Sequence, residues 1–207
     1  LTLNGHTLQL KNNTTYDEDI NLNGKGFVLT DETSGNDANN ATFTGTFQII
    51  NAAYTISGID LLGGATDDYI VGIASTTGIT IENCDISTSN TNAGSSLIKL
   101  VNTTQVPTIT ISGNTFDMSN ATYGIYLSGT TAITEITNLS IQGNTFNNIN
   151  NTADKCIVLR ADQQDTYEID AVNIGTTSGN TFNAGTAAGD AIYFEKYNAA
   201  LTDEILA

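Results

Sequence analysis

Basic residues are scarce in this sequence, and their scarcity excludes two broad classes of partner. The 207 residues include only 6 Lys and Arg against 22 Asp and Glu, so the formal net charge is −16 at pH 7. Nucleic-acid binding needs clustered basic residues to contact phosphates, and an electrostatic anchor on anionic lipid needs a polybasic segment. We therefore expect no nucleic-acid partner. An acidic chain rich in Asn and Thr favours an extracellular or cell-surface location, where net charge maintains solubility.

The sequence also lacks a long apolar run and a leader segment. No stretch approaches the roughly 18 apolar residues that a membrane-spanning helix needs, so we expect no membrane insertion. There is no initiator Met and no signal peptide, and the chain starts directly in an apolar alternation at Leu1 and Leu3. This start predicts a processed product or a piece of a longer chain.

Side chains that commonly perform catalysis are few. His6 is the single histidine, and Arg160 is the single arginine. Polysaccharide cleavage by β-elimination needs a basic side chain beside acidic Ca²⁺ ligands, and glycoside hydrolysis needs two or three convergent carboxylates. No G-x-S-x-G motif, zinc-ligand spacing, phosphate loop or EF-hand is present. These absences weigh against an enzyme without excluding one.

What the sequence has in abundance is one repeated phrase. "ITISGNTFDMS" at 109–119 returns as "LSIQGNTFNNI" at 139–149 and as "SGNTFNAG" at 178–185. In each copy an apolar anchor precedes a large apolar residue by five positions, as Ile111 precedes Phe116, and the last copy carries three extra residues. A second strand-like segment follows each copy, and these segments end at Ile73, Leu100, Leu127, Leu159 and Phe194. Such a period marks a repeat array whose units pack against their neighbours.

The local texture of the repeat predicts strands. Apolar residues alternate with period two, β-branched residues dominate, and Gly-Asn turns interrupt each run. One winding of short strands per period gives an all-β parallel β-helix of about six or seven rungs, about 4.8 Å apart. We expect one domain over 1–207, with less regular first rungs in 1–42, regular rungs in 43–197 and a terminal segment in 198–207.

The recurring asparagine of the phrase predicts a corner. Asn114, Asn144 and Asn180 occupy one register position, where stacked Asn side chains can hydrogen-bond along the axis and tolerate the left-handed backbone of a tight turn. Cys84 takes the same corner in its rung, and we expect it to be half-buried. Because Cys156 belongs to another column and another height, we expect two free thiols, with intermolecular pairing through Cys156 left open.

Rungs of the form I-x-I-x-x-N-x-F resemble those of the right-handed parallel β-helix (pectate-lyase-like) superfamily. The resemblance covers roughly Phe43 to Phe194 and is closest in character to cell-surface and adhesin-type repeat proteins. It implies the fold, whereas it is nearly silent on activity, since that superfamily includes polysaccharide lyases, hydrolases, phage tailspikes and surface proteins.

One cluster of carboxylates follows from the alignment of the rungs. Asp60 and Asp85 share a register position on adjacent rungs, so they should lie about 5 Å apart on the outside, with Glu82 nearby. Like charges at that separation can hold a cation or raise a pKa. A Ca²⁺ site, an acid/base pair and two solvated acids all remain open, and Ca²⁺ is the only cofactor that the sequence suggests.

A second candidate is an outward face of the second strand column. If Leu100, Leu127 and Leu159 point inward, then Lys99, Tyr126, Val158 and Tyr193 point outward, with Arg160 beside them. Aromatic rings and cations on a flat sheet suit a sugar chain or a protein surface, although Tyr and Val also favour exposed strand positions for their own sake. We predict Lys99, Tyr126, Arg160 and Tyr193 as ligand-binding residues.

The sequence predicts two further surfaces. A row of hydroxyl and amide side chains at Thr55, Thr80, Thr110, Ser140 and Asn173 predicts a polar stripe on another face. Open end rungs expose unpaired strand edges, which favours self-association. The sequence thus predicts a surface structural or adhesive protein that self-assembles or binds polysaccharide or protein. The alternative is a carbohydrate-active enzyme, a lyase or hydrolase or an inactive relative, with Asp60, Glu82 and Asp85 as its acids.

Overall fold

The computed structural model consists of strands and the turns that join them. It describes residues 5–23, 26–33, 39–50, 52–74, 77–101, 105–129, 134–161, 167–185 and 189–196. Over these ranges 21 strands form three sheets of seven strands each, and every pairing is parallel. No helix within these ranges is long and apolar enough to cross a membrane. The predicted segment 198–207 lies outside the described residues.

Each sheet takes every third strand of the chain. Sheet A contains β1 (His6–Leu10), β4 (Phe27–Asp31), β7 (Tyr54–Ser57), β10 (Ile79–Glu82), β13 (Gln105–Ser112), β16 (Thr134–Gln142) and β19 (Tyr167–Ile174). Sheet B contains β2 (Thr15–Asp17), β5 (Thr42–Thr44), β8 (Asp60–Gly63), β11 (Asp85–Thr88), β14 (Thr115–Asp117), β17 (Thr145–Ile149) and β20 (Thr181–Ala184). Sheet C contains β3 (Ile20–Asn23), β6 (Phe47–Ile50), β9 (Tyr69–Ala74), β12 (Ser96–Leu100), β15 (Tyr123–Gly129), β18 (Lys155–Ala161) and β21 (Asp190–Lys196).

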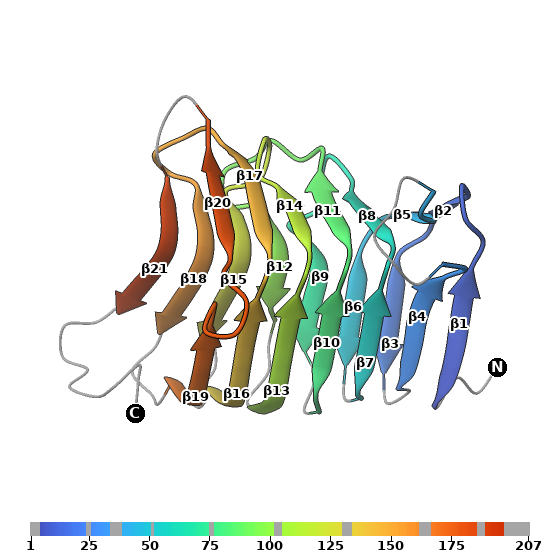
Figure 1. The fold of residues 1–207 in the computed structure, drawn as a ribbon, viewed down its shortest axis with the longest axis horizontal. Helices are drawn as coiled ribbons and strands as arrows, with labels where there is room; N and C mark the ends of the chain where they lie inside the picture. Colours follow the sequence, from blue (N-terminus) through green and yellow to red (C-terminus); the bar gives the residue numbers. More distant parts are fainter. Residues whose placement is uncertain are drawn as a thin grey trace.

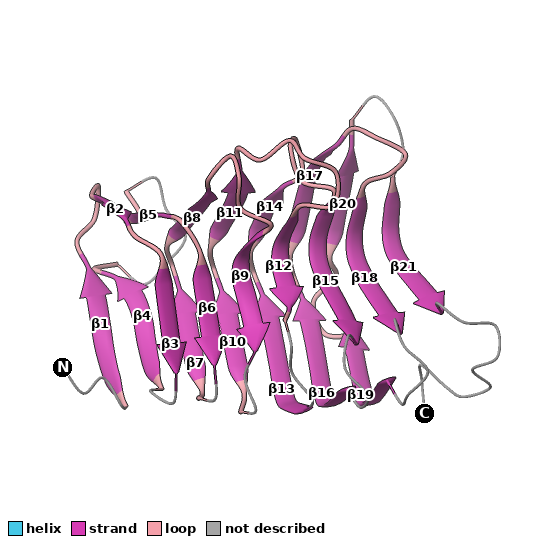
Figure 2. Cartoon of the chain, turned by 180° about the vertical axis from the view of Figure 1, so that it is seen from behind, coloured by secondary structure: helices cyan, strands magenta, loops and turns pink. Residues whose placement is uncertain are grey.

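This order confirms the predicted parallel β-helix and gives it seven rungs. In Figure 1 the strands of sheet A run upward on the near side while the chain advances from right to left. Figure 2 shows the opposite side, where the strands of sheet C run downward as the chain advances from left to right. The winding is therefore right-handed, as expected for parallel strands joined by crossovers.

The core is built from columns of like residues, one per rung. Along sheet A, for example, Leu29, Ile56, Ile81 and Ile111 are register partners, and each is at most 1% exposed. Along sheet B the rings of Phe116, Phe146 and Phe182 stack with centroids 4.6 and 5.2 Å apart. A rung therefore buries its apolar face only because the next rung carries the same kind of side chain at the same position.

The repeated phrase bends between sheets A and B. Six residues, 175–180, separate β19 from β20, whereas in the four preceding rungs a strand of sheet A is followed by a strand of sheet B with two residues between them. The first of those two residues is Gly58, Asn83, Gly113 or Gly143, with φ between 53° and 67°. The left-handed conformation therefore belongs to the residue before the ladder asparagine, not to that asparagine as predicted. Glycine and asparagine adopt it at the lowest steric cost.

The asparagines at this corner form a hydrogen-bonded ladder. The Asn144 Oδ1 accepts hydrogen bonds from both the backbone N–H and the Nδ2 of Asn114, each at 3.0 Å. The Asn180 Oδ1 likewise accepts hydrogen bonds from the backbone N–H of Asn144 at 2.9 Å and from its Nδ2 at 3.0 Å. Each amide nitrogen also donates to a carbonyl of the preceding rung, as Asn144 Nδ2 does to Ile111 O at 2.9 Å. Asn114 and Asn144 are buried, so these bonds satisfy polar groups that water does not reach.

Both cysteines are free thiols within this core. Cys84 is 0% exposed, so the prediction that it is half-buried is wrong, because the corner position is enclosed by the rungs on either side. Cys156 is also 0% exposed, which leaves no access for an intermolecular disulfide in the folded protein. Burial raises the pKa of each thiol to about 12, so both are protonated near neutral pH.

Candidate functional site

The outer face of sheet C carries tyrosines and cations in two adjacent columns. The first column is formed by the opening residues of five strands: Tyr69, Ser96, Tyr123, Lys155 and Asp190. The second column lies three residues later in each strand: Gly72, Lys99, Tyr126, Val158 and Tyr193. Because each column takes one residue per rung, its members follow the axis of the solenoid about 4.8 Å apart.

Contacts within a rung and between neighbouring rungs hold the tyrosine rings in place. The rings of Tyr123 and Tyr126 lie 4.7 Å apart at a tilt of 33°. Arg160 Nη1 donates to the hydroxyl of Tyr126 at 3.2 Å, and Arg160 Nε lies 3.2 Å from Glu195 Oε2. Tyr126 and Arg160 are half-buried. These side chains are therefore ordered before any ligand arrives, which lowers the entropy cost of binding.

Lys155 fixes the third aromatic ring of the face. Its Nζ lies 2.7 Å from Asp190 Oδ2 and 4.2 Å from the centroid of the Tyr193 ring. The hydrogen bond with Asp190 raises the pKa of Lys155, although partial burial opposes the shift. A cation over an aromatic face adds a further attraction. Tyr193 thus stays half-exposed with one face covered by Lys155.

The structure brings the four predicted ligand-binding residues together on consecutive rungs. Lys99 pairs in register with Tyr126, and Tyr193 lies two rungs beyond Tyr126 in the same column. Val158 occupies the rung between them but is only 1% exposed, so it does not offer the open surface that the sequence predicted. Neighbouring side chains cover it, since it is absent from the buried core cluster.

We call the outer surface formed by Tyr69, Ser96, Lys99, Tyr123, Tyr126, Lys155, Arg160 and Tyr193 the tyrosine face. Three of these residues, Tyr69, Ser96 and Tyr123, were missed in the sequence. Each is the first residue of its strand, and the residue that follows it is buried. Because the alternation of inward and outward side chains is interrupted there, the period-two pattern did not predict whether these residues face the core or the outer surface. The ring of Tyr69 lies over Gly72, where an added Cβ would come within 2.5 Å of the ring. A tyrosine three residues before a glycine or an outward tyrosine is the signal that could have located Tyr69 and Tyr123, and Ser96 then follows as their register partner.

The predicted acidic site contains two neighbouring carboxylates. Asp60 and Asp85 are register partners on β8 and β11, and Asn40 Nδ2 donates to Asp60 Oδ1 at 2.9 Å. Glu82 ends β10 on sheet A, across the corner from both. Within the described ranges, no group of three or more His, Cys, Asp or Glu side chains could hold a metal ion. The sequence-based Ca²⁺ site and acid/base role stay predictions that rest on the aspartate pair.

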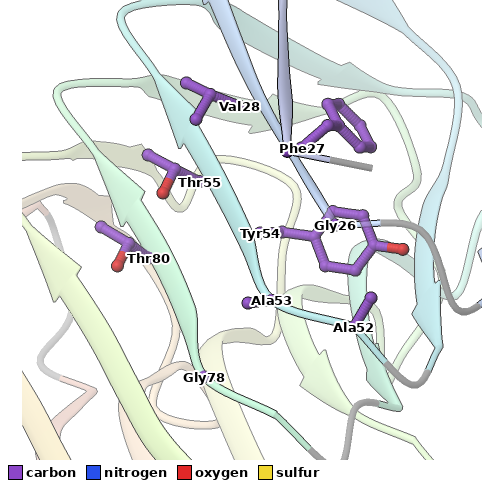
Figure 3. A pocket seen from close by; sticks show the side chains of 10 residues that line it. Gly26, Phe27, Val28, Ala52, Ala53, Tyr54, Thr55, Gly78 and Thr80 are labelled. Atoms are coloured by element: carbon purple, nitrogen blue, oxygen red, sulfur yellow. The ribbon is translucent and has the colours of Figure 1, made fainter. Parts of the chain in front are cut away.

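A groove of about 660 Å³ runs along the outer side of sheet A over the first rungs. Its floor comes from small residues that share one register position, namely Gly5, Gly26, Ala53 and Gly78. Figure 3 shows Val28, Thr55 and Thr80 in a row beside this floor. Thr55 and Thr80 belong to the hydroxyl row that the sequence predicted, whereas the groove itself was missed. Among the described residues, no charged side chain lines it.

Comparison with known proteins adds no relative to this picture. No family model, no curated protein and no solved structure matches the chain. The parallel β-helix architecture consequently stands on the three parallel sheets and their register alone.

Proposed function

We propose that the protein is an extracellular, surface-located adhesive β-helix that binds a polysaccharide through the tyrosine face. The observation that carries this proposal is the set of three half-exposed tyrosine rings, Tyr123, Tyr126 and Tyr193, held by contacts with Lys155 and Arg160. Sugar rings present apolar C–H faces and polar edges, so they suit a surface of aromatic rings bordered by hydrogen-bonding side chains.

The shape of the site favours a polymer over a small molecule. A sheet of a solenoid is a long, shallow surface, whereas small ligands need a concave pocket that buries most of their area. A polymer gains affinity from several weak contacts along its length. The tyrosine face offers rings on every second rung from β9 to β21, so a polymer can contact several of them along its length.

A paired substitution tests the proposal. Polysaccharides cast into native gels should retard the wild-type protein, and Tyr126→Ala combined with Tyr193→Ala should weaken that retardation at least about tenfold, since truncation of a central aromatic commonly costs more than 1 kcal/mol. Leu62→Ala is the matched control, because Leu62 is 37% exposed on the outer side of sheet B. Equal retardation of the paired variant and the control would contradict the proposal.

Self-association through the end rungs is a second candidate, supported by apolar side chains at one end of the tube. Ile192 and Phe194 continue inward columns of sheet C, yet they are 39% and 47% exposed because β21 is the outermost strand of the sheet described. Exposed apolar groups on an edge strand favour association with another strand. Light scattering across protein concentration, with and without Ca²⁺, should show growth in mass if this candidate holds. A constant monomer mass would contradict it.

The same proposal places the chain in the pectate-lyase-like superfamily, among its surface proteins. The I-x-I-x-x-N-x-F rungs support this placement, since they form the corner ladder and the Phe116–Phe146–Phe182 stack. The enzyme alternative depends on Asp60, Glu82 and Asp85, and Glu82 lies on a different sheet from the two aspartates. The geometry therefore favours binding over cleavage.

A further inference from the structure

We propose that the ligand of the tyrosine face is an uncharged polysaccharide that lies along the solenoid axis, and that its contacts extend to the row Tyr69–Ser96–Tyr123. This inference rests on the proposed polysaccharide binding and adds the charge class, the direction and further contact residues. It follows from three features of the face: its internal ion pairs, the direction of its columns and a buried hydroxyl without a partner.

The first feature is the internal neutralisation of the cations. Lys155 is paired with Asp190 at 2.7 Å, and Arg160 lies 3.2 Å from Glu195. Of the three described cations on the face, only Lys99 has no carboxylate within 4.0 Å among the described side chains. An anionic polymer would have to compete with two carboxylates already in place, and it would approach a protein whose net charge is −16. An uncharged chain neither competes with these carboxylates nor is repelled by the net negative charge.

The second feature is the direction of the columns. Tyr69 and Tyr123 lie two rungs apart in the first column, and Tyr126 and Tyr193 lie two rungs apart in the second. The face extends from β9 to β21, which is four rung steps or about 19 Å along the axis. A chain laid along the axis contacts rings on every second rung, whereas a chain laid across the sheet meets the rings of a single rung.

The third feature is Ser96, which lies between Tyr69 and Tyr123 in the first column. Ser96 is 2% exposed, and its hydroxyl oxygen has no hydrogen-bond partner within the described part of the chain. Buried hydroxyls are normally hydrogen-bonded, so an unpaired one calls for a partner from outside the protein. Its hydroxyl oxygen is covered in this structure, so a sugar hydroxyl would reach it only where the flanking side chains move apart, and there it would supply the missing bond and anchor the chain at this rung.

Matched pairs of polymers test the charge class. Hydroxyethylcellulose and dextran are uncharged, whereas carboxymethylcellulose and dextran sulfate carry anions on the same two backbones. Affinity electrophoresis should show binding to a neutral member at least about tenfold tighter than to its anionic counterpart. Tighter binding of the anionic member would overturn this inference while leaving the proposed polysaccharide binding in place. Binding of none of the four polymers would contradict both.

Two sets of variants sharpen the test. Asp190→Asn combined with Glu195→Gln removes the internal counter-charges, so the ratio of anionic to neutral affinity should rise at least about tenfold. Ser96→Ala should weaken binding of the neutral polymer about fivefold while leaving the thermal midpoint at or above that of the wild type, because it removes an unsatisfied buried group. An unchanged charge ratio in the first set would overturn the charge class. Unchanged affinity in Ser96→Ala would overturn the extended row.

Discussion

The two halves of the corner between sheets A and B support the same bend with different chemistry. In the C-terminal half, Asn114, Asn144 and Asn180 join successive rungs by side-chain hydrogen bonds of 2.9 to 3.0 Å. In the N-terminal half, Ala41 and Ile59 hold the same register position, and both are 0% exposed. A turn of the solenoid can thus be closed either by a polar ladder or by an apolar plug.

Cys84 lies at the boundary between the two halves and partly replaces an asparagine. Its backbone N–H donates to Asn114 Oδ1 at 3.0 Å, and this is the last hydrogen bond of the ladder toward the N-terminus. Its Sγ lies 3.8 Å from Ile56 O, the carbonyl to which an asparagine amide would donate in the pattern of the later rungs. The difference teaches that the ladder needs asparagine on every rung, since each member satisfies its neighbour.

The largest effect is expected where the ladder is cut in its middle. Asn144→Ala removes the acceptor of two Asn114 hydrogen bonds and the donor to Ile111 O and to Asn180 Oδ1. Each unsatisfied buried group costs about 1–3 kcal/mol, so the free energy of unfolding should fall by about 4 kcal/mol in urea titrations.

The control for the ladder is an asparagine pair outside the core. Asn183 is exposed, and its Nδ2 donates to Asn147 Oδ1 at 2.7 Å. Asn183→Ala should lower the free energy of unfolding by less than about 0.5 kcal/mol, because water replaces the lost bond. Similar losses in the two variants would show that burial does not give the corner ladder its strength.

A somewhat smaller loss is expected from the apolar half of the corner. Ile59→Ala leaves a cavity at a position that is 0% exposed, and such truncations cost about 3 kcal/mol. Urea unfolding of this variant beside Asn144→Ala compares the two chemistries directly. A loss below about 1 kcal/mol would mean that this half of the corner can collapse around the missing side chain, contrary to a tightly packed plug.

Alkaline titration tests the burial of Cys84, the residue between the two halves of the corner. Burial raises the pKa of Cys84 from 9.0 to about 12, so the unfolded state loses the thiol proton first as pH rises. Stability from this thiol is therefore constant below pH 9 and declines between pH 9 and 12, by about 1.4 kcal/mol per pH unit where the slope is steepest. Cys84→Ala should show a shallower decline than the wild type. Parallel declines would contradict burial of the thiol.

The smallest expected effect is a gain from extending the ladder by one rung. In Cys84→Asn the new amide can donate to Ile56 O, and its Oδ1 can accept the backbone N–H of Ile59, as the later rungs do. The net gain should be about 1 kcal/mol in the free energy of unfolding, with Cys84→Ser as the control that lacks the amide. A loss greater than that of Cys84→Ser would mean that packing excludes the larger side chain.

The fold was predictable because every rung of the solenoid places the same kinds of residue at the same positions. Residues such as Ile111, Asn114 and Phe116 recur at fixed offsets, so a single alignment defines a core column, a corner and a second core column. The division of each phrase into two sheets was less visible, because in four of the rungs only two residues separate the strands. The side of Val158 was misjudged for a related reason, since alternation describes direction but not the cover that neighbouring side chains provide.

The site was predictable only in part. The outward positions of Tyr126, Arg160 and Tyr193 were predictable because these residues alternate with inward leucines and phenylalanine along their strands. The ion pairs of Lys155 and Glu195 were not predicted, because they depend on which side chains meet across rungs. Tyr69, Ser96 and Tyr123 open their strands at a bend, where alternation assigns no side. The groove beside Thr55 and Thr80 arises from small residues on four separate rungs, a pattern that no single repeat displays.

The most direct test of the account is to map the contact surface of the protein by hydrogen–deuterium exchange. Exchange is measured with and without the polysaccharide that binds most tightly in the gel assay. We expect added protection in β9, β12, β15, β18 and β21, the strands of the tyrosine face, with none in β4, β7 and β10 along the groove of sheet A. Protection confined to β4, β7 and β10 would contradict the central claim and would assign binding to the groove instead.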